Sequence, residues 1–597
     1  MPLMLKRAAD SGNVVQDSGK AYAVNVPLSL RIWGMVIMWL VTIHWAQQNR
    51  KEEKNMRKRF IATTLTMAMC ASLFAGCSSG SGSSSQSGSS ASGGDVTFTI
   101  GFSMEPPSMD PKDFNTTACT LIGYDCYDTL LNFAMDSSEL EPCIAESWEQ
   151  VDDTTYTYKI RDDIKFSDGN AMTMDDVLFS MERVKNDAYS MSYLFDSVDH
   201  FEVDADTWTL TVYLKEPNST WKYVPATSPC TIVEKAVVEE EGDDYGQLTG
   251  SVVGTGPYML DKWESGTEIT LKKNPYYWND PDSLDVDKVV YEVIEDDTSR
   301  ALAAQSGQID YARSLTTDTL PTYESAQNMT INAYDGTTAN YLAYNCEKAP
   351  FDDANARKAI SYCIDKDAYT SLIGGKYATT QKALFIPSSM YEIDKDGWNE
   401  ANDSLESYQQ DYAKAKECLA ASKYPDGFEF NLYTSATYKT GAEAIQNMIK
   451  ESGLPITVNI VEYQNSDSFS ISYGYTTDDE GHRVYDALMT GWVSDWLDPT
   501  GYMANCLYGK SNYAGGANKS AYSSEQFDDL LHQSYLTSDD AQRSELMLNA
   551  MKIAVEDCPV DTLYETKDTY IINDKFEYEE GPNFFWNFSV ANVHLKK

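Results

Sequence analysis

Nucleophilic, acidic and basic side chains are plentiful in this 597-residue chain, but none has the spacing that catalysis requires. There is no Gly-x-x-x-x-Gly-Lys-Ser/Thr loop for nucleotide phosphates and no His-Glu-x-x-His helix for catalytic zinc. The segment Gly254-Thr-Gly-Pro257 lacks the third glycine of a dinucleotide-binding turn, and its proline favours a structural corner. Nothing in the sequence therefore points to an enzyme, and we expect no cofactor.

Histidine and cysteine are placed unfavourably for binding a metal ion. Four histidines follow residue 77, and none lies near a cysteine at ligand spacing. The nine cysteines after residue 77 form no Cys-x-x-Cys motif, and an odd number of thiols is unable to pair completely within the chain. We predict no metal site and interpret these cysteines as buried free thiols, with Cys119 and Cys126 as one potential pair.

Residues 56–94 have the pattern of an export signal followed by a tether. A basic cluster at 57–59 precedes an apolar run at 60–75, and Gly76-Cys77 follows. Residues 78–94 hold ten serines and five glycines, the composition of a flexible linker. Cys77 resembles the acceptor of bacterial lipid attachment, although Phe74 stands where leucine is usual. The alternative is a membrane anchor, but 60–75 is shorter than the roughly 20 residues that a spanning helix needs.

The signal starts well inside the chain, because 55 residues precede Met56. Residues 51–55 can be encoded by a purine-rich ribosome-binding sequence, so we hypothesise that translation begins at Met56 and that 1–55 is a mis-annotated extension. The alternative is that Ile32–Trp45 forms an additional membrane segment, although it is also short for a span. The signal peptide is then 56–76, and the working protein begins at Cys77.

Length and charge limit the possible classes of protein. The 521 residues from Cys77 onward are too many for one hydrophobic core and indicate at least two domains. They carry 36 Lys and Arg against 87 Asp and Glu, a net charge of −51. This charge repels nucleic acid and acidic lipid headgroups, so we exclude nucleic acid as a partner.

Strands and helices alternate along the rest of the chain, which predicts an α/β or α+β fold. Alternating apolar and polar residues predict strands at 96–102, 156–160, 207–214, 268–271 and 289–294. Helical periodicity and start signals predict helices that begin after Thr173, over 353–372, over 411–422 and over 440–452.

A series of longer motifs resembles the peptide/nickel-type solute-binding proteins of ABC importers, also known as extracellular solute-binding protein family 5. The matching segments occur in the family's order at 104–111, 140–148, 155–169, 175–183, 254–258, 274–278, 350–360 and 424–427. Physically most of them are structural, because they form turns, corners and helix caps. The resemblance implies a two-lobed periplasmic-binding-protein-like α/β fold with an inserted subdomain and a hinge.

The resemblance also implies domain boundaries. The core subdomain of lobe 1 is expected at 95–131, 254–333 and 572–597, the inserted subdomain at 132–253, and lobe 2 at 334–571.

The segment Gly491-Trp-Val-Ser-Asp-Trp-Leu-Asp-Pro499 holds the ligand information. In peptide-binding relatives, the aspartate of the Gly-Trp-x-x-Asp segment pairs with the amino terminus of the peptide, and Asp495 matches that position. A desolvated carboxylate facing an ammonium group makes a charge-assisted hydrogen bond. Trp492 is expected to supply an apolar wall. The structural alternative is that Asp495 caps a local turn and Trp492 belongs to the core, while Asp498-Pro499 is read as a turn in either case.

The other end of the ligand is less well defined by the resemblance. Dipeptide-binding relatives place an arginine just before the position of Tyr438 to hold the peptide carboxylate, and this chain has Thr437 there. A longer peptide, bound as an added strand through its backbone, fits this difference better than a short one held at both ends. Tyr438, Tyr127 and Thr117 are predicted by resemblance to line the cleft.

The implied function is capture of a peptide by lobe closure and delivery to an ABC permease that works with separate ATPase subunits. We expect a monomer anchored through lipid on Cys77 to the outer face of the cell membrane. Two alternatives stay open: the same fold binding an oligosaccharide or a nickel complex, and a peptide sensor or chaperone without a transport role.

Overall fold

The computed structural model describes residues 95–597 except 115, 136, 187–190, 465–466, 514–515 and 579–587, together with the backbone of two short strands near the start. These strands, β1 (Val14–Asp17) and β2 (Lys20–Ala23), pair antiparallel and belong to a separate unit that ends at Ser92. The predictions for residues 56–94, including lipidation of Cys77, lie outside the described residues.

The second unit, Gly93–Lys597, is built around an 11-stranded mixed sheet. The strand order is β10-β11-β12-β3-β13-β19-β14-β18-β16-β17, with β15 paired to β19. Parallel pairs join β12 to β3, β3 to β13, β16 to β17 and β16 to β18. The strands are β3 (Thr97–Phe102), β10 (Tyr258–Glu264), β11 (Glu268–Lys273), β12 (Lys288–Val293), β13 (Tyr311–Arg313), β14 (Met329–Tyr344), β15 (Ala378–Thr380), β16 (Phe428–Thr434), β17 (Ile456–Glu462), β18 (Ala487–Val493) and β19 (Val560–Asn573).

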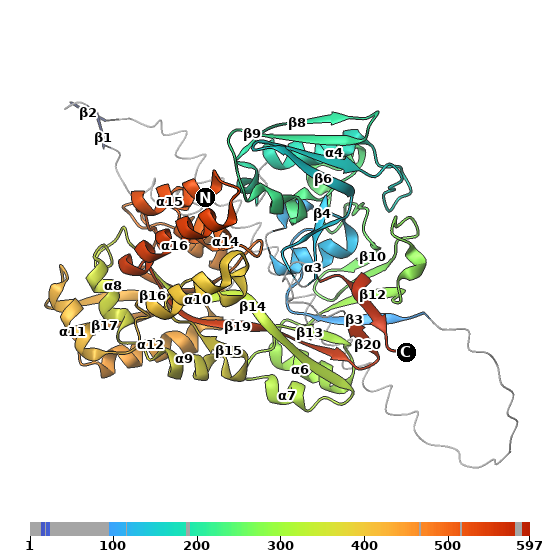
Figure 1. The fold of residues 1–597 in the computed structure, drawn as a ribbon. Coiled ribbons are helices and arrows are strands. Elements are labelled where there is room, and N and C mark those ends of the chain that lie inside the picture. The colour runs from blue at the N-terminus through green and yellow to red at the C-terminus, as the bar shows by residue number, and fades with distance from the viewer. Residues whose placement is uncertain are drawn as a thin grey trace, which may run out of the picture. The chain divides into compact units, whose positions relative to one another are not determined.

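Two long strands connect the two halves of this sheet. β14 has 16 residues and β19 has 14, and they pair antiparallel along most of their length. At one end β19 pairs with β13 (Figure 1), and at the other end β14 pairs with β18. The register of β14 against β19 shifts between Asp335 and Thr338 and again between Asn340 and Tyr341. Bulges of this kind bend a strand, so the bends lie where β14 passes from one half to the other.

A smaller four-stranded antiparallel sheet lies within residues 145–214, in the order β6-β7-β9-β8. Its strands are β6 (Ala145–Asp152), β7 (Thr155–Ile160), β8 (Val198–Asp204) and β9 (Thr209–Leu214). Two further pairs are β4 (Leu131–Phe133) with β5 (Leu140–Pro142) and β20 (Phe576–Tyr578) with β21 (Val593–Leu595). The five predicted strands are confirmed as β3, β7, β9, β11 and β12, with ends that differ by no more than two residues.

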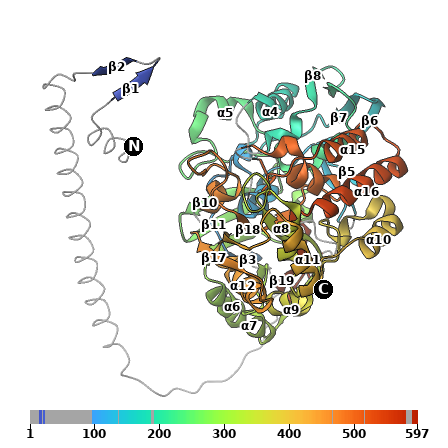
Figure 2. The ribbon, with the colours of Figure 1, turned by 90° about the vertical axis from the view of Figure 1, so that its left-hand side faces the viewer.

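The helices pack around these sheets, and α15 and α16 lie side by side (Figure 2). They are α3 (Thr117–Cys126), α4 (Met174–Asn186), α5 (Lys235–Glu241), α6 (Asp297–Ser306), α7 (Leu320–Glu324), α8 (Ala354–Ser361), α9 (Lys366–Ile373), α10 (Lys395–Ser404), α11 (Tyr412–Ala421), α12 (Lys439–Glu451), α13 (Ser468–Ser472), α14 (Thr500–Tyr502), α15 (Glu525–Tyr535) and α16 (Asp540–Asp557). The predicted start of α4 is confirmed, because Thr173 and Asp176 exchange hydrogen bonds as a capping box.

One helix prediction is wrong. Residues 353–372 form two helices, α8 and α9, instead of one continuous helix. The Asp365 side chain accepts a hydrogen bond from the backbone N–H of Ala368 and so begins a new helix. The periodicity misled the prediction because Ala359 and Ile360 at the end of α8 are followed at helical spacing by Cys363 and Ile364, which are also buried but lie in the break.

The buried side chains form three large clusters. One is drawn from residues 339–564 and another from 98–127, 233–311 and 570–593. The third is drawn from 130–232 but also contains Trp496, which lies far away in sequence. All nine cysteines after Cys77 are free thiols, so Cys119 and Cys126 do not pair. No helix in the described part of the chain is long and apolar enough to cross a bilayer.

Candidate ligand-binding site

The Gly-Trp-x-x-Asp segment lies at the end of β18, where the strand leaves the sheet interior. Residues 487–490 of β18 are buried, and residues 491–493 are half-buried. β14 pairs with β18 as far as Val493, whereas β16 pairs with it only at Ala487 and Leu488. Among the described elements, residues 489–493 therefore have a strand on one edge only. An edge without a neighbouring strand has the backbone groups that an added strand can pair with.

Asp495 follows this strand and is almost completely buried, with 6% of its surface exposed. Its Oδ2 atom accepts hydrogen bonds from the Tyr193 hydroxyl at 2.7 Å and from the Asn505 amide at 3.2 Å. Burial raises the pKa of Asp495 to about 6, while these two hydrogen bonds act in the opposite direction. Asp495 forms no ion pair with any residue that the structure describes. At neutral pH it is a buried carboxylate without a counter-charge.

The side chains around Asp495 come from distant parts of the sequence. Tyr193 lies in a short 3-10 helix at Ser192–Phe195, 302 positions from Asp495. Burial raises the pKa of Tyr124, on α3, and of Tyr473, after α13, and the Asp495 carboxylate raises both further. Uncharged phenol groups from three segments therefore surround the carboxylate.

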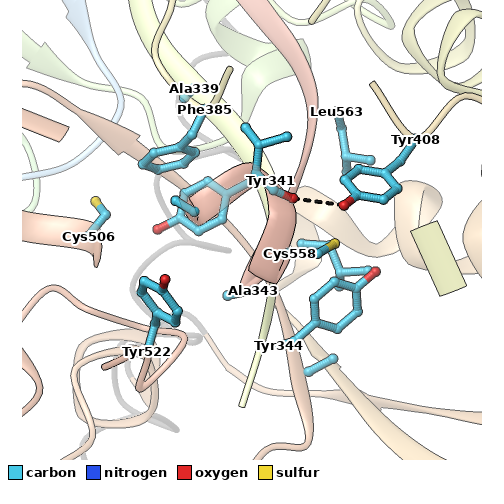
Figure 3. Close-up of a cluster of buried hydrophobic side chains, with 14 of the residues drawn as sticks. Ala339, Tyr341, Ala343, Tyr344, Phe385, Tyr408, Cys506, Tyr522, Cys558 and Leu563 are labelled. Carbon is cyan, nitrogen blue, oxygen red and sulfur yellow. Dashed lines mark hydrogen bonds between the residues drawn. The ribbon is translucent and has the colours of Figure 1, made fainter. Parts of the chain in front are cut away.

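Asn505 belongs to a π-helical turn at Met503–Leu507 that follows α14. Such turns are rare and are frequent at functional sites. The next residue, Cys506, is buried, and Figure 3 shows the Tyr341 hydroxyl pointing toward it from β14. The Tyr341 ring packs edge-on against Phe385, with 4.7 Å between the ring centroids. The turn that carries Asn505 is thus held against the core of the sheet.

Asp498, three residues further on, has a different environment. Its Oδ1 atom accepts a hydrogen bond from the backbone N–H of Thr500, which confirms the predicted turn. Its Oδ2 atom lies 2.9 Å from the Arg543 guanidinium, and both side chains are completely buried. Burial opposes ionisation, but Arg543 and Thr500 outweigh it and hold the pKa of Asp498 below its usual range.

Trp492 and Tyr438 lie on opposite faces of β18. Gly491 faces Tyr438, because a Cβ atom on Gly491 would lie 2.8 Å from the Tyr438 hydroxyl oxygen. That hydroxyl donates to Oδ1 of Asn340, the residue that pairs with Gly491 across the strands. Successive side chains of a strand alternate in direction, so Trp492 points the other way. Its indole N–H donates to the Gly501 carbonyl at 3.0 Å. Glycine at 491 is what allows Tyr438 to approach the strand.

Trp496 connects this segment to the cluster formed by residues 130–232. Its ring stacks on Tyr223 with 6.2 Å between centroids, and its indole N–H donates to Thr500 Oγ1 at 3.2 Å. The backbone N–H of Ser219 also donates to the Tyr535 carbonyl of α15 at 2.9 Å. Together with the Tyr193–Asp495 bond, these contacts join residues 132–253 to the segments that surround β18.

The remaining predicted residues lie on or next to α3. Tyr127 is 2% exposed and donates from its hydroxyl to the Met109 carbonyl at 3.1 Å, within the cluster of residues 98–127 and 233–311. This environment favours packing, and a ligand contact for Tyr127 stays a prediction. Thr117 is the first residue of α3, but its side chain lies outside the described part of the structure.

Sequence reasoning missed several residues of this site. Tyr193 and Asn505 touch Asp495 directly, and Lys519 lies beside Trp492, with 5.9 Å from its Nζ to the centre of the indole ring. Tyr193 is one of 40 tyrosines and stands next to no motif, so nothing local marks it. Lys519 could have been noticed as a lysine between Asn518 and Ser520 in a small-residue loop. The described residues contain no group of three metal-ligating side chains.

Comparisons with known proteins agree on one family. The profile of the "Bacterial extracellular solute-binding proteins, family 5 Middle" matches residues 139–514, more than half of the chain. The glutathione-binding protein GsiB of Escherichia coli K12 is 26% identical over 477 residues, which are 78% of this chain and 88% of GsiB. From the same organism, the "Probable D,D-dipeptide-binding periplasmic protein DdpA" is 27% identical over 508 residues, 83% of this chain and 92% of DdpA.

A solved structure shows the same architecture. The periplasmic binding protein DppA from Helicobacter pylori, in complex with the peptide STSA, superposes with a TM-score of 0.73 at 25% identity and covers 84% of this chain and 98% of DppA. This match confirms the predicted two-lobed α/β fold. The family and the relatives are described as binding proteins, in agreement with the prediction that the chain is not an enzyme. The chain belongs to the bacterial extracellular solute-binding proteins of family 5.

Proposed function

We propose that this protein captures peptides between its two lobes, with Asp495 receiving the amino terminus. The observation that carries this proposal is a nearly buried carboxylate that no cation in the described residues balances. An unpaired buried charge is costly, and such a charge is retained where a ligand supplies the partner. GsiB is named as glutathione-binding, DdpA as a probable D,D-dipeptide-binding protein, and DppA was solved in complex with the peptide STSA, which supports a ligand of this class.

The free edge of β18 suggests how the rest of the peptide binds. Residues 489–493 have no strand on one side in the described part of the fold, so an extended peptide can add there through main-chain hydrogen bonds. Recognition of the backbone tolerates different side chains and different lengths. We therefore include oligopeptides in the proposed ligand class.

Capture by lobe closure is supported by the contacts that link the two parts of the chain. The Tyr193–Asp495 bond and the Trp496–Tyr223 stack connect the proposed inserted subdomain at 132–253 to the proposed lobe 2 at 334–571. β14 and β19 are the strands that run between the two halves, so their bulged region is the proposed hinge. Lobe 1 in this proposal also contains 95–131, 254–333 and 572–597.

Delivery of the captured peptide requires a membrane transporter as partner and a position outside the cell membrane. We assign the protein to an ABC importer, with a permease and ATPase subunits as partners, and we expect it to act as a monomer. DppA of H. pylori is described as associated with an ABC transporter, which supports this role. Residues 57–77 have the pattern of a lipoprotein signal, so lipid on Cys77 would anchor the protein outside the cell membrane. The intact mass of the native protein and release of a Cys77→Ser variant from the membrane fraction test the anchor.

A peptide-library pull-down tests the ligand class. The purified protein is incubated with mixed peptides of two to ten residues whose amino termini are either free or acetylated, and the retained peptides are identified by mass spectrometry. We expect free-amine peptides to be retained at least tenfold better than acetylated ones. Asp495→Ala should abolish that preference, because the carboxylate that recognises the ammonium is gone.

The matched control is Asp529→Ala, which removes an exposed carboxylate from α15. It should behave like the unmodified protein. Equal retention of acetylated and free-amine peptides by the unmodified protein would contradict the role of Asp495. Retention of no peptide at all would contradict the proposed function itself.

A further inference from the structure

Lys519 is a buried cation beside the proposed peptide site that no carboxylate in the described residues balances. It is 5% exposed, and its Nζ donates to Thr490 Oγ1 at 2.8 Å and to the Gly491 carbonyl at 3.2 Å. Both acceptors are uncharged and belong to β18. The aromatic rings of Tyr473 and Trp492 lie 5.3 and 5.9 Å from the ammonium group. Aromatic faces stabilise a cation partly, but less than a carboxylate does.

Apart from Arg483, the other buried cations in the described chain are balanced by a carboxylate or bonded to backbone carbonyls. The Arg183, Lys366 and Arg543 side chains lie 2.7, 2.8 and 2.9 Å from the carboxylates of Asp110, Asp561 and Asp498. Arg357 has no such partner, but its guanidinium donates to the backbone carbonyls of Phe351, Asp557 and Cys558. Lys519 makes two hydrogen bonds to neutral groups and leaves one N–H direction for a further acceptor.

A second cation makes the site around Lys519 more positive. Arg483 is also 5% exposed and donates to the Asn518 carbonyl at 2.8 Å and to the Asn512 side chain at 3.2 Å. Its charge and the burial of Lys519 both oppose protonation of the lysine, and burial lowers the pKa of Lys519 to about 8. Two neighbouring buried cations create a local potential that attracts an anion, in a protein whose net charge is strongly negative.

The loop that carries Lys519 is held rigidly. Asn518 is completely buried, and its side-chain amide donates to the carbonyls of Tyr508 and Tyr522 at 3.0 and 2.8 Å. The Tyr485 hydroxyl donates to the Lys519 carbonyl at 2.8 Å. An ammonium group held in place before the ligand arrives loses little entropy on binding, so its position suits recognition.

The ammonium group bonds to β18 at positions that pair with β14 but not with β16. The Gly491 carbonyl, to which Lys519 donates, lies beyond the last β16 contact at Leu488. Thr490 and Asp495 are five positions apart, at most about 17 Å along an extended chain. An extended ligand that reaches from Asp495 to Lys519 therefore needs roughly two to five residues.

We propose that Lys519 binds a carboxylate of the peptide ligand and forms the second charged anchor of the site whose first anchor is Asp495. This inference rests on the proposed function, because it concerns the same ligand. The carboxylate has two chemical sources: the carboxyl terminus of a peptide of two to five residues, or an aspartate or glutamate side chain near the start of a longer one. In the first case Lys519 would take the role that the family resemblance implies for an arginine before the position of Tyr438.

Peptide pools that differ in their carboxylates test the assignment. Tripeptides and pentapeptides with mixed residues are prepared as free acids and as carboxy-terminal amides, both with free amino termini, and the peptides that the protein retains are identified by mass spectrometry. If the terminal carboxylate is the source, free acids should be retained at least tenfold better than amides. If a side chain is the source, the amide pool should show at least tenfold enrichment of Asp and Glu over Asn and Gln at one position.

Lys519→Gln should reduce either preference to less than about threefold, which corresponds to the loss of a charge-assisted hydrogen bond. The preference for free over acetylated amino termini should remain, because Asp495 is unchanged. Lys519→Arg, which keeps the charge, should keep most of the carboxylate preference. Lys552→Gln is the matched control, since Lys552 is an exposed lysine on α16.

A measurement on the unmodified protein gives an answer even if the variants fold poorly. The carboxylate preference, whether of free acids over amides or of Asp and Glu over Asn and Gln, should fall as pH rises from 8 to 10, because the ammonium group of Lys519 loses its proton. An unchanged preference in Lys519→Gln, or no carboxylate preference in the unmodified protein, would overturn the inference. Peptides retained with an amine preference alone would leave the proposed function standing, whereas no retention of any peptide would reject both.

Discussion

Asp495 and Asp498 lie three residues apart in one segment, are both nearly or fully buried, and yet have opposite electrostatic properties. Asp498 is compensated by Arg543 and held ionised, with its pKa below the usual range. Asp495 has two neutral donors, and burial raises its pKa to about 6. The difference shows which charge belongs to the scaffold. A carboxylate with an internal counter-charge contributes to the fold, whereas in the proposed function the one without a counter-charge receives the ligand.

The comparison extends to the cations. Arg543 reaches Asp498 from α16, whereas Lys519 contacts the hydroxyl of Thr490 and a carbonyl. The segment 490–498 thus lies next to one satisfied ion pair and two unsatisfied charges of opposite sign. We assign stability to Asp498 and binding to Asp495. Substitutions at the two positions should therefore change either the free energy of unfolding or the affinity for peptides, but not both.

The largest expected effect is on stability. Arg543→Gln leaves the Asp498 carboxylate buried without a cation, and removing one partner of a buried ion pair costs about 3–5 kcal/mol. We expect the free energy of unfolding, measured by urea denaturation followed by circular dichroism, to fall by this amount. Because the folded pKa of Asp498 is depressed, its contribution is present above the unfolded value of 3.8 and is lost as pH falls through the lower folded pKa.

Lys552→Gln serves as the control for this change, since it removes an exposed charge from the same helix. It should alter the free energy of unfolding by no more than about 0.5 kcal/mol. A loss below 1 kcal/mol in Arg543→Gln would mean that water or a rearranged neighbour compensates Asp498. The contrast between the two aspartates would then disappear.

The second effect is on binding. Asp495→Asn keeps the size and an oxygen acceptor but removes the charge, and losing a charge-assisted hydrogen bond of about 1.5–3 kcal/mol lowers affinity for free-amine peptides roughly 10- to 150-fold. The free energy of unfolding should stay within about 1 kcal/mol or rise, because no counter-charge is left unpaired. Isothermal titration calorimetry and urea denaturation measure the two quantities. A loss of stability as large as in Arg543→Gln would show that Asp495 belongs to the scaffold.

The sequence predicts the fold better than the site, and the reason is physical. Strands such as β7 and β9 are recognisable because apolar and polar residues alternate within six positions, and the capping box at Thr173 is a local signal too. The break between α8 and α9 was missed because the buried apolar residues continue at helical spacing from the end of α8 into the break. Local patterns define helices and strands. A helical pattern is interrupted only by another local signal, which here is the N-cap residue Asp365.

The site depends on contacts that no local pattern encodes. Asp495 and Trp492 could be proposed because they stand in a recognisable motif. Tyr193 reaches Asp495 from 302 positions away, and Lys519 becomes notable only once its burial is known. Whether a charged residue is compensated is a property of the folded arrangement. Sequence reasoning assigned Asp495 to the ligand by resemblance and Asp498 to a turn, but whether each carboxylate has a counter-charge was beyond it.

The third effect is the pH dependence of binding. Asp495 receives an ammonium group only when ionised, so affinity for free-amine peptides should fall about tenfold per pH unit below pH 6 and change little from 6 to 7. Burial raises the pKa of the neighbouring phenols of Tyr124, Tyr193 and Tyr473, and these groups stay neutral in this range. Calorimetric titrations between pH 4.5 and 7.5 measure the effect. Acetylated peptides and Asp495→Asn should show no such decline, and a parallel decline in either would assign it to another group.

The smallest effect concerns the hydroxyl that Tyr193 extends to Asp495. Tyr193→Phe removes a 2.7 Å hydrogen bond to a carboxylate but keeps the ring, so the expected loss of binding is about 1 kcal/mol, roughly fivefold in affinity. That bond lowers the pKa of Asp495, so its removal should move the acid decline of binding above pH 6. A merely structural role for Tyr193 predicts weaker binding with the midpoint unchanged. A shifted midpoint shows instead that a residue 302 positions away sets the charge state of Asp495, and that the proposed inserted subdomain helps to define the amine site.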